Sequence, residues 1–98
     1  QRYAQVRLPA LAWGEKDGTV TNSERRISRQ RSFMTAPDEA RADWWQVAEV
    51  GKRMGFSEAF AYPDAASVFR EFAAQTGFEN AGTRVLDISD RATMSNAR

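Results

Sequence analysis

The clearest repeat of apolar positions in this chain lies between residues 42 and 54. Apolar residues recur there at intervals of three and four, the spacing that places side chains on one face of an α-helix. They are Trp44, Val47, Ala48, Gly51 and Met54. Lys52 and Arg53 suit the C-terminal end of a helix dipole, and Gly55 is a typical terminator. The pattern predicts a helix over Ala42–Met54 with this face turned inward.

A second helical pattern follows Pro63, and it predicts a helix over Asp64–Thr76. Its apolar residues also share one face, which we expect to be core; they are Val68, Phe69, Phe72 and Ala73. Gly77 is expected to cap this helix. Beyond it, Val85–Ile88 suggests an extended segment.

Three shorter stretches favour extended chain, because they are rich in β-branched or alternating apolar residues. Tyr3–Leu8 predicts one strand, and Thr19–Thr21 and Arg26–Phe33 predict two more. Asp17-Gly18 and Asn22-Ser23 are turn signals. Together these patterns predict an α/β fold of short strands and two main helices.

Ninety-eight residues allow one domain at most, and we expect residues 1–98 to form a single partial domain with a polar, frayed tail over residues 90–98. The chain begins at Gln1 and enters an apolar segment at once, so we expect a piece of a longer protein. It contains no apolar run of membrane-spanning length. Its net charge of +1 excludes a strongly polyanion-seeking protein on bulk charge.

The residue types that are missing limit the chemistry. The chain has no cysteine, which excludes a disulfide, a thiolate nucleophile or an iron–sulfur ligand within it. It has no histidine either, the commonest general base and metal ligand. Any catalysis by this chain alone would depend on carboxylates, lysine, tyrosine or hydroxyl groups.

The segment Gly14–Arg31 concentrates polar side chains. Three carboxylates, on Glu15, Asp17 and Glu24, fit either an acid/base or metal cluster or simply solvated turns. The arginines fit a phosphate-binding ribbon, single-stranded nucleic-acid binding or a solvated surface; they are Arg25, Arg26, Arg29 and Arg31.

Asp43 precedes Trp44 at the start of the first predicted helix. One interpretation is a helix N-cap, whose side-chain oxygen accepts a backbone hydrogen bond. The other is a ligand-binding carboxylate that accepts two donors from the edge of a guanine. The residue type permits both.

Three strings of residues carry a family resemblance. They are LPALAWGEKDGTVTNSERRISRQR at residues 8–31, APDEARADWWQVAEVGKRMGF at residues 36–56 and SVFREFAAQTGFENAGTRVLDIS at residues 67–89. In this order they resemble the large molybdopterin-guanine-dinucleotide oxidoreductases, most of all the catalytic subunits of bacterial assimilatory nitrate reductases. The resemblance covers roughly Arg2–Asp90. The third string narrows it to the assimilatory enzymes.

The resemblance implies an internal segment of a large multi-domain α/β enzyme. Enzymes of this kind carry molybdenum bound by bis-molybdopterin guanine dinucleotide and a 4Fe-4S cluster, whose ligands are not in this segment. They reduce nitrate to nitrite by oxygen-atom transfer, so the implied partners are nitrate, the remaining domains of the enzyme and an electron-donor protein or reductase subunit. The implied location is the cytoplasm, with no nucleic-acid or membrane partner, and the isolated segment is expected to be inactive.

Carried over residue by residue, the resemblance assigns cofactor binding to Lys16 and Asp43. It assigns a supporting role to five further motif residues: Glu15, Asn22, Glu24, Arg25 and Arg26. It places no catalytic residue and no metal ligand here. The alternatives are a formate dehydrogenase of the same superfamily and, in another class, a small basic nucleic-acid-binding module.

Overall fold

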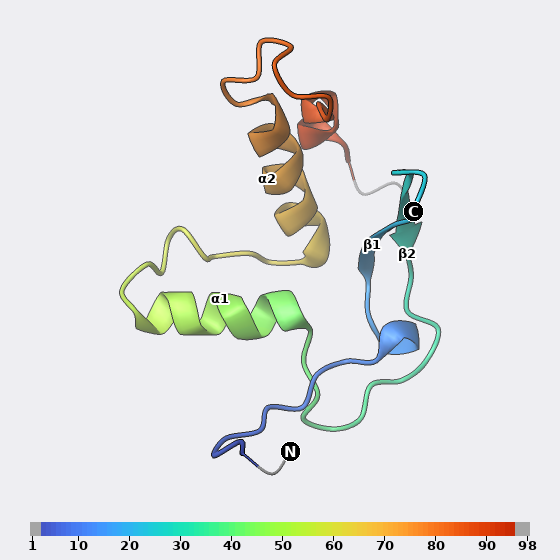
Figure 1. Cartoon of the computed structure of the whole chain (residues 1–98). Coiled ribbons are helices and arrows are strands. Elements are labelled where there is room, and N and C mark those ends of the chain that lie inside the picture. The colour runs from blue at the N-terminus through green and yellow to red at the C-terminus, as the bar shows by residue number, and fades with distance from the viewer. Residues whose placement is uncertain (1–2, 96–98) are drawn as a thin grey trace. The chain divides into compact units, whose positions relative to one another are not determined.

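The computed structural model describes residues 3–95 (Figure 1). Its elements follow in the order η1 (Trp13–Glu15), β1 (Gly18–Thr21), β2 (Ile27–Gln30), α1 (Asp43–Arg53), α2 (Ala65–Gly77) and η2 (Ser89–Thr93), where η marks a 3-10 helix. Two helices and one antiparallel two-stranded sheet confirm the predicted α/β class. The chain divides into two compact units between Ala61 and Tyr62.

The hairpin of β1 and β2 is organised by the turn at Asn22. Gly18 pairs with Gln30, and Thr21 pairs with Ile27 at the other end of the ladder. The side-chain oxygen of Asn22 accepts hydrogen bonds from two backbone amides of the turn, which is how an asparagine stabilises a tight reversal. Arg25 adopts a φ of 65°, in the left-handed region. The two predicted strands are confirmed, the second with shorter bounds.

The turn predicted at Asp17-Gly18 is wrong, because the chain is extended after η1 and no turn lies between η1 and β1. Gly18 is already the first residue of β1. Asp17 instead accepts hydrogen bonds from the backbone amide and hydroxyl of Ser32, at 3.4 and 3.3 Å. The side chain is therefore used to hold the far end of the hairpin rather than to close a turn.

The strand predicted over Tyr3–Leu8 is wrong, because none of those residues forms a ladder. Tyr3, Val6 and Leu8 are 90%, 74% and 64% exposed. A strand needs a neighbour to pair its backbone groups, and the nearest pairing is an isolated bridge between Ala10 and Arg41. An alternating pattern without a partner did not produce a strand.

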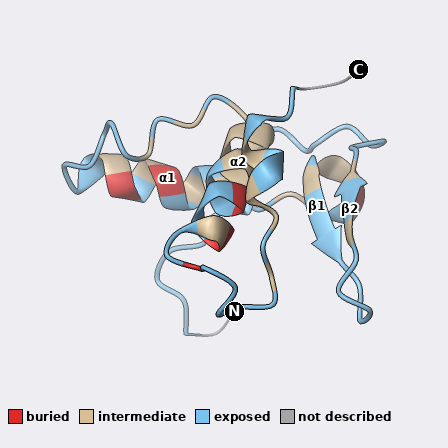
Figure 2. Cartoon of the chain, turned by 90° about the horizontal axis from the view of Figure 1, so that it is seen from above, coloured by how far each residue is buried: buried red, intermediate tan, exposed pale blue. Residues whose placement is uncertain are grey.

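Helix α1 lies within one residue of its predicted bounds at each end, and Gly55 follows it with a φ of +100°, as a helix terminator does. Ala48 and Gly51 are buried, visible as the red bands on α1 in Figure 2. Val47 and Met54, predicted to face inward with them, are exposed.

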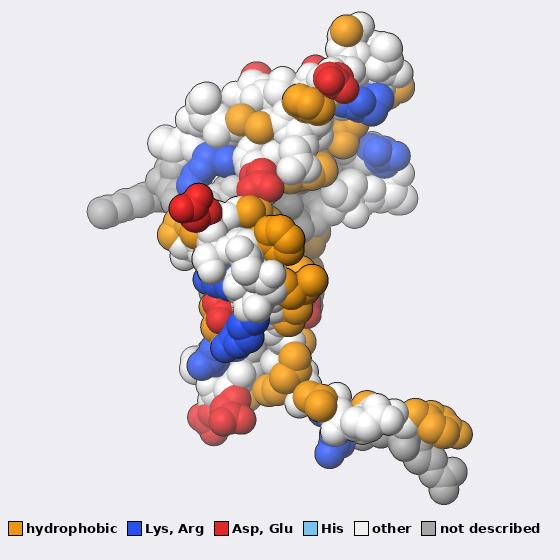
Figure 3. Space-filling view, turned by 90° about the vertical axis from the view of Figure 1, so that its left-hand side faces the viewer, with side chains coloured by type: hydrophobic (Ala, Val, Ile, Leu, Met, Phe, Trp, Pro, Cys, Tyr) orange, Lys and Arg blue, Asp and Glu red, His pale blue; other side chains and the backbone are white. Residues whose placement is uncertain are grey.

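Only alanines are buried among the apolar residues that the structure describes: Ala40, Ala48 and Ala73. Many larger apolar side chains lie on the surface instead, as Figure 3 shows. The buried face of α1 is set by Phe60, since a Cβ placed on Gly51 would lie 2.6 Å from its ring. The helical period was therefore predicted correctly. The predicted buried face was too wide, because it included Val47 and Met54, which are exposed.

Helix α2 starts after Asp64, whose carboxylate caps it by accepting the amide of Ser67 at 2.7 Å. The helix includes Gly77, which the sequence predicted as a cap beyond it. A Cβ on Gly77 would lie 2.6 Å from the Cβ of Ser89, so the glycine allows η2 to approach the helix closely. Ala73 is fully buried, whereas Phe72 of the predicted stripe remains 43% exposed.

The loop between α2 and η2 is built around Asn80, which is 1% exposed. Its amide group donates to the carbonyls of Thr76 and Leu86, and its oxygen accepts the backbone amide of Arg84 at 2.7 Å. The hydroxyl of Thr76 accepts the amide of Ile88 at 2.9 Å. These bonds satisfy a buried polar centre.

The segment predicted as extended, Val85–Ile88, forms no strand and leads into η2. Residues 90–93 of the predicted frayed tail belong to η2, whose residues contact α2. Residues 96–98 of that tail lie outside the described residues.

Candidate functional site

The structure brings Lys16 and Asp43 together although 27 positions separate them in the sequence. The ammonium nitrogen of Lys16 lies 3.2 Å from a carboxylate oxygen of Asp43. The side chains are 33% and 67% exposed, so a donor and an acceptor lie side by side within reach of solvent. The Gly14–Gly18 segment and the start of α1 therefore lie close together, as a shared role for these two residues requires.

Lys16 is held in place by the segment just before it. The carboxylate of Glu15 accepts the backbone amide of Ala12 at 2.7 Å, which closes η1. The carbonyl of Gly14 accepts the amides of Phe33 and Met34 at 2.9 and 3.0 Å. Lys16 then leaves η1 in an extended conformation.

The approach of residues 33 and 34 explains why residue 14 is a glycine. A Cβ on Gly14 would lie 2.8 Å from the sulfur of Met34 and 2.9 Å from the ring of Phe33. The side-chain amide of Gln30 also donates to the carbonyl of Trp13, which links β2 to η1. The segment that presents Lys16 is thus held by the strand and loop that follow the hairpin turn.

Asp43 is positioned by the connection that precedes α1. The amide of Leu11 donates to the carbonyl of Arg41, and the amide of Arg41 donates to the carbonyl of Pro9, at 3.1 and 3.2 Å. The side chain of Gln46, one turn into α1, donates to both of those carbonyls. The start of α1 is therefore tied to the segment that leads into η1, which explains why the two site residues meet.

Asp43 does not cap α1, so the N-cap interpretation is wrong. Ala42 occupies the N-cap position and makes no side-chain capping bond, while Asp43 is the first helical residue. An anionic side chain in the first turn suits the positive end of the helix dipole. Its carboxylate is directed to Lys16 rather than to the helix amides.

The five motif residues divide into two groups. Glu15 and Asn22 orient backbone, by their bonds to Ala12 and to the hairpin turn. Glu24, Arg25 and Arg26 lie exposed in the turn itself. The turn is therefore shaped by Asn22 and presents the charged side chains to solvent.

The carboxylates of Glu15 and Asp17 are both engaged with the chain, at Ala12 and Ser32. Among residues 3–95, no group of three His, Cys, Asp or Glu side chains is placed to hold a metal ion. The same residues contain no helix long and apolar enough to cross a membrane.

Sequence reasoning did not single out Gln46 or Arg41, which fix the position of Asp43. No local signal marks a glutamine that bonds carbonyls 37 and 5 positions away. Arg41 also lies over the ring of Trp45, with its guanidinium carbon 5.9 Å from the ring centroid, a cation–π distance.

Comparison with known proteins shows several relatives. The chain is 61% identical over 94 residues to a nitrate reductase of Klebsiella oxytoca, covering 96% of this chain and 11% of that protein. It is 48% identical over 99 residues to a nitrate reductase of Shewanella frigidimarina, covering 99% and 10%. A formate dehydrogenase alpha subunit of Methanococcus maripaludis is 44% identical over 72 residues, covering 74% and 11%.

The chain thus spans about a tenth of the length of these relatives. No solved structure matches it. The family model described as molybdopterin oxidoreductase matches residues 1–53, which include η1, the hairpin and α1 and so contain both Lys16 and Asp43. Because this match covers more than half of the sequence, the chain belongs to the molybdopterin oxidoreductase family.

Proposed function

We propose that this chain is a segment of a molybdenum-dependent nitrate reductase of the assimilatory type, and that Lys16 and Asp43 line the pocket for one molybdopterin guanine dinucleotide. The family implies a molybdenum–pterin cofactor. The observation that carries the proposal is the 3.2 Å approach of the Lys16 ammonium to the Asp43 carboxylate. Two segments that the family model covers converge there.

The two side chains fit the cofactor's chemistry. A lysine supplies positive charge and three donors, which suits the anionic diphosphate of a dinucleotide. A carboxylate accepts two parallel bonds from the N–H and amino groups on one edge of guanine, a pattern that adenine does not offer. Both groups are partly exposed, so a ligand can reach them.

When bound, the molybdenum centre supplies the oxygen-atom transfer that converts nitrate to nitrite. This chain's contribution is to bind and orient: Lys16 by charge and Asp43 by base recognition. Glu15 fixes the backbone just before Lys16, and Asn22 shapes the hairpin turn. The 4Fe-4S cluster and the molybdenum ligands belong to other parts of the enzyme, and the assimilatory assignment places the enzyme in the cytoplasm.

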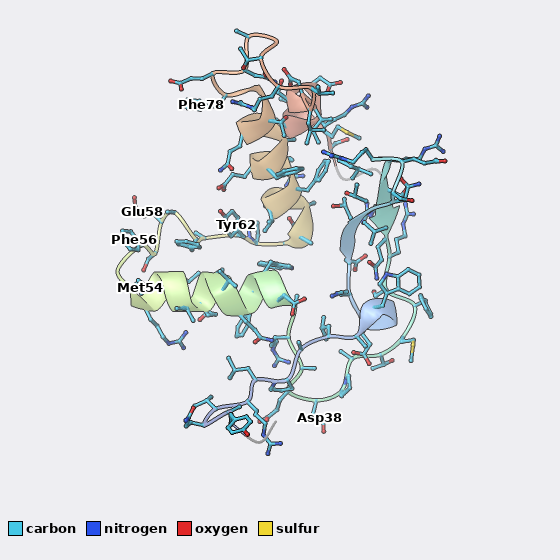
Figure 4. The ribbon with its side chains drawn as sticks, in the orientation of Figure 1. Asp38, Met54, Phe56, Glu58, Tyr62 and Phe78 are labelled. Carbon is cyan, nitrogen blue, oxygen red and sulfur yellow. The ribbon has the colours of Figure 1, made fainter. Side chains whose placement is uncertain are left out.

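The test is Asp43→Ala in a full-length nitrate reductase that carries this segment. Hydrogen bonds to charged groups contribute about 1.5–3 kcal/mol each, roughly ten- to a hundred-fold in affinity. Bound cofactor and nitrate turnover should therefore fall together. Glu58→Ala is the control, because Glu58 lies exposed in the loop after α1 (Figure 4) and should alter neither quantity.

A charge swap separates ligand binding from a simple surface ion pair. Lys16→Asp combined with Asp43→Lys rebuilds the ion pair with its ends reversed. If the pair serves only to hold the fold, the double variant should recover cofactor content. If the residues bind the dinucleotide, the double variant should stay as depleted as Asp43→Ala. Full occupancy in either variant would contradict the proposal.

A formate dehydrogenase remains the second candidate, because the archaeal relative matches 74% of the chain at 44% identity. The same full-length protein, assayed with nitrate plus reduced viologen dye and with formate plus oxidised dye, decides between them. The isolated 98-residue chain should be inactive in both assays, because it has no cysteine to hold an iron–sulfur cluster. Turnover by the isolated chain above a no-protein control would contradict the assignment as a segment.

A further inference from the structure

An apolar stripe along α1 stands next to the candidate site without a role in it. We use this term for Val47, Val50 and Met54, which are 65%, 55% and 69% exposed. Counted from Asp43, they follow at intervals of four, three and four residues, so all four side chains form a row on one face of the helix. Figure 4 shows Met54 at the C-terminal end of this row. The apolar stripe therefore begins at the carboxylate of the candidate site.

The other faces of α1 already have partners. Ala48 and Gly51 are buried, with the ring of Phe60 against the glycine. On the polar face, the carboxylate of Glu49 pairs with Lys52 and Arg53, each at 2.9 Å. Within residues 3–61, the apolar stripe is a face of α1 left without cover. Soluble proteins rarely leave contiguous apolar surface open without a partner for it.

The lengths of the relatives indicate what covers it. The nitrate reductases align along 96% and 99% of this chain, and this chain amounts to 11% and 10% of their length. In those proteins the matching residues are part of a much longer polypeptide. A second copy of the chain is the weaker occupant, because three aliphatic side chains fall well short of the roughly 800 Å² that each partner contributes to a standard interface.

We propose that the apolar stripe is the docking seat for another segment of the longer oxidoreductase polypeptide. The occupant presents apolar side chains to Val47, Val50 and Met54. Because the row starts at Asp43, the Lys16–Asp43 site then lies at the edge of an internal interface, which would enclose a bound ligand from one side. The docking claim rests on the proposed function only in taking the full-length protein to be a relative of the nitrate reductases.

The test uses a thiol, since the chain has no cysteine of its own. Val50→Cys is introduced into the 98-residue chain and into a full-length nitrate reductase that carries this segment. A maleimide then labels the protein, and mass spectrometry of the α1 peptide gives the labelling rate independently of other cysteines. Glu58→Cys, in the exposed loop after α1, is the control for reagent access.

The thiol should react fast in the 98-residue chain and at least about tenfold more slowly in the full-length protein, where only local opening exposes it. Equal rates would overturn the proposal. Slow labelling in dilute 98-residue chain would assign the cover to residues 62–98 and overturn it too. If the thiol is protected from labelling only at high concentration of the 98-residue chain, a second copy is the occupant. That result would also overturn the proposal.

If the full-length protein that carries this segment does not fold, the same cysteine can be placed in the Klebsiella oxytoca nitrate reductase, at the residue that aligns with Val50. The labelling rate is then measured in that native protein. The outcome is separable from that of the proposed function. Unchanged cofactor content in Asp43→Ala would defeat the cofactor assignment and leave slow labelling at position 50 intact. Fast labelling at position 50 would defeat the docking seat and leave the Asp43 result intact.

Discussion

The two compact units of this chain are stabilised by contacts of different range. In the first unit, segments far apart in sequence meet through exposed or backbone groups: Gly14 with residues 33 and 34, and Pro9 with Arg41. In the second unit, the bonds of the buried polar centre at Asn80 and Thr76 join residues four to twelve positions apart. The candidate site lies in the first unit, where distant segments converge.

This difference in contact range and exposure indicates where a ligand site can form. The buried bonds of the second unit satisfy its polar centre internally, so little is left to offer a ligand. The long-range contacts of the first unit bring two charged side chains to one point and leave them partly exposed.

The largest effect is expected for Asn80→Ala. The side chain is 1% exposed, and its removal strands the part-buried backbone amide of Arg84 and takes a donor from the carbonyls of Thr76 and Leu86. Each stranded group costs about 1–3 kcal/mol. Hydrogen exchange of the amides in α2 and the following loop, with chemical denaturation, measures the loss.

Asn22→Ala is the matched control, because its side-chain oxygen also accepts two backbone amides but lies exposed. Water can replace those bonds, so the cost should stay near that of one ordinary hydrogen bond, about 1 kcal/mol. Equal losses for the two asparagines would contradict the contrast between the units.

Gly77→Ala should have the next largest effect. The added methyl group would lie 2.6 Å from the Cβ and hydroxyl of Ser89, so η2 must move away from α2. Overpacking of this kind costs about 1–3 kcal/mol. Gly18→Ala, which meets nothing within 4 Å, is the control. Exchange of the η2 amides should rise in the first variant only; unchanged exchange would mean that the contact between α2 and η2 is loose.

Asp43→Ala should change the stability of the isolated chain by less than about 1 kcal/mol, since exposed ion pairs contribute little. A double-mutant cycle with Lys16→Ala measures the coupling between the two side chains. A small coupling, set beside the large loss of cofactor expected in the full-length enzyme, would mark the pair as a ligand site. Coupling well above 1 kcal/mol would indicate a structural role instead.

The smallest effects are expected from pH, and they should fall at opposite ends of the scale. Hydrogen bonding from Lys52 holds the pKa of Glu49 below its ordinary value. Its stabilising contribution is therefore present above the pKa of the unfolded chain and is lost as pH falls through the folded-state pKa. The last turn of α1 should loosen in acid, and Glu49→Gln should remove this dependence.

In the second unit, the hydrogen bond to Glu71 raises the pKa of Tyr62 above its ordinary value. That contribution is present below the pKa of the unfolded chain and is lost as pH rises through the folded-state pKa. Tyr62→Phe should remove the alkaline dependence. Residue-resolved NMR titration follows both groups, and loosening of both at the same end of the scale would contradict the assignment.

The helices, the hairpin and the family could be predicted from the sequence alone. The bounds of α1 followed from a three-to-four residue period, because helical hydrogen bonds and side-chain spacing are local. The hairpin turn followed from Asn22, whose side chain bonds its own neighbourhood. The meeting of Lys16 and Asp43 was expected only from the resemblance, since no local rule joins residues 27 positions apart.

Features that depend on partners distant in sequence could not be predicted in this way. Tyr3–Leu8 alternates like a strand and forms none, because a ladder needs a second strand. The period of α1 could not choose between Val47 and Ala48, and the ring of Phe60 against Gly51 decided which side is buried. No signal in the sequence marked Asn80 for burial, which came from α2 and residues 84–88 folding around it. Local hydrogen bonding fixes an element from its own residues, whereas burial of any face depends on what packs against it.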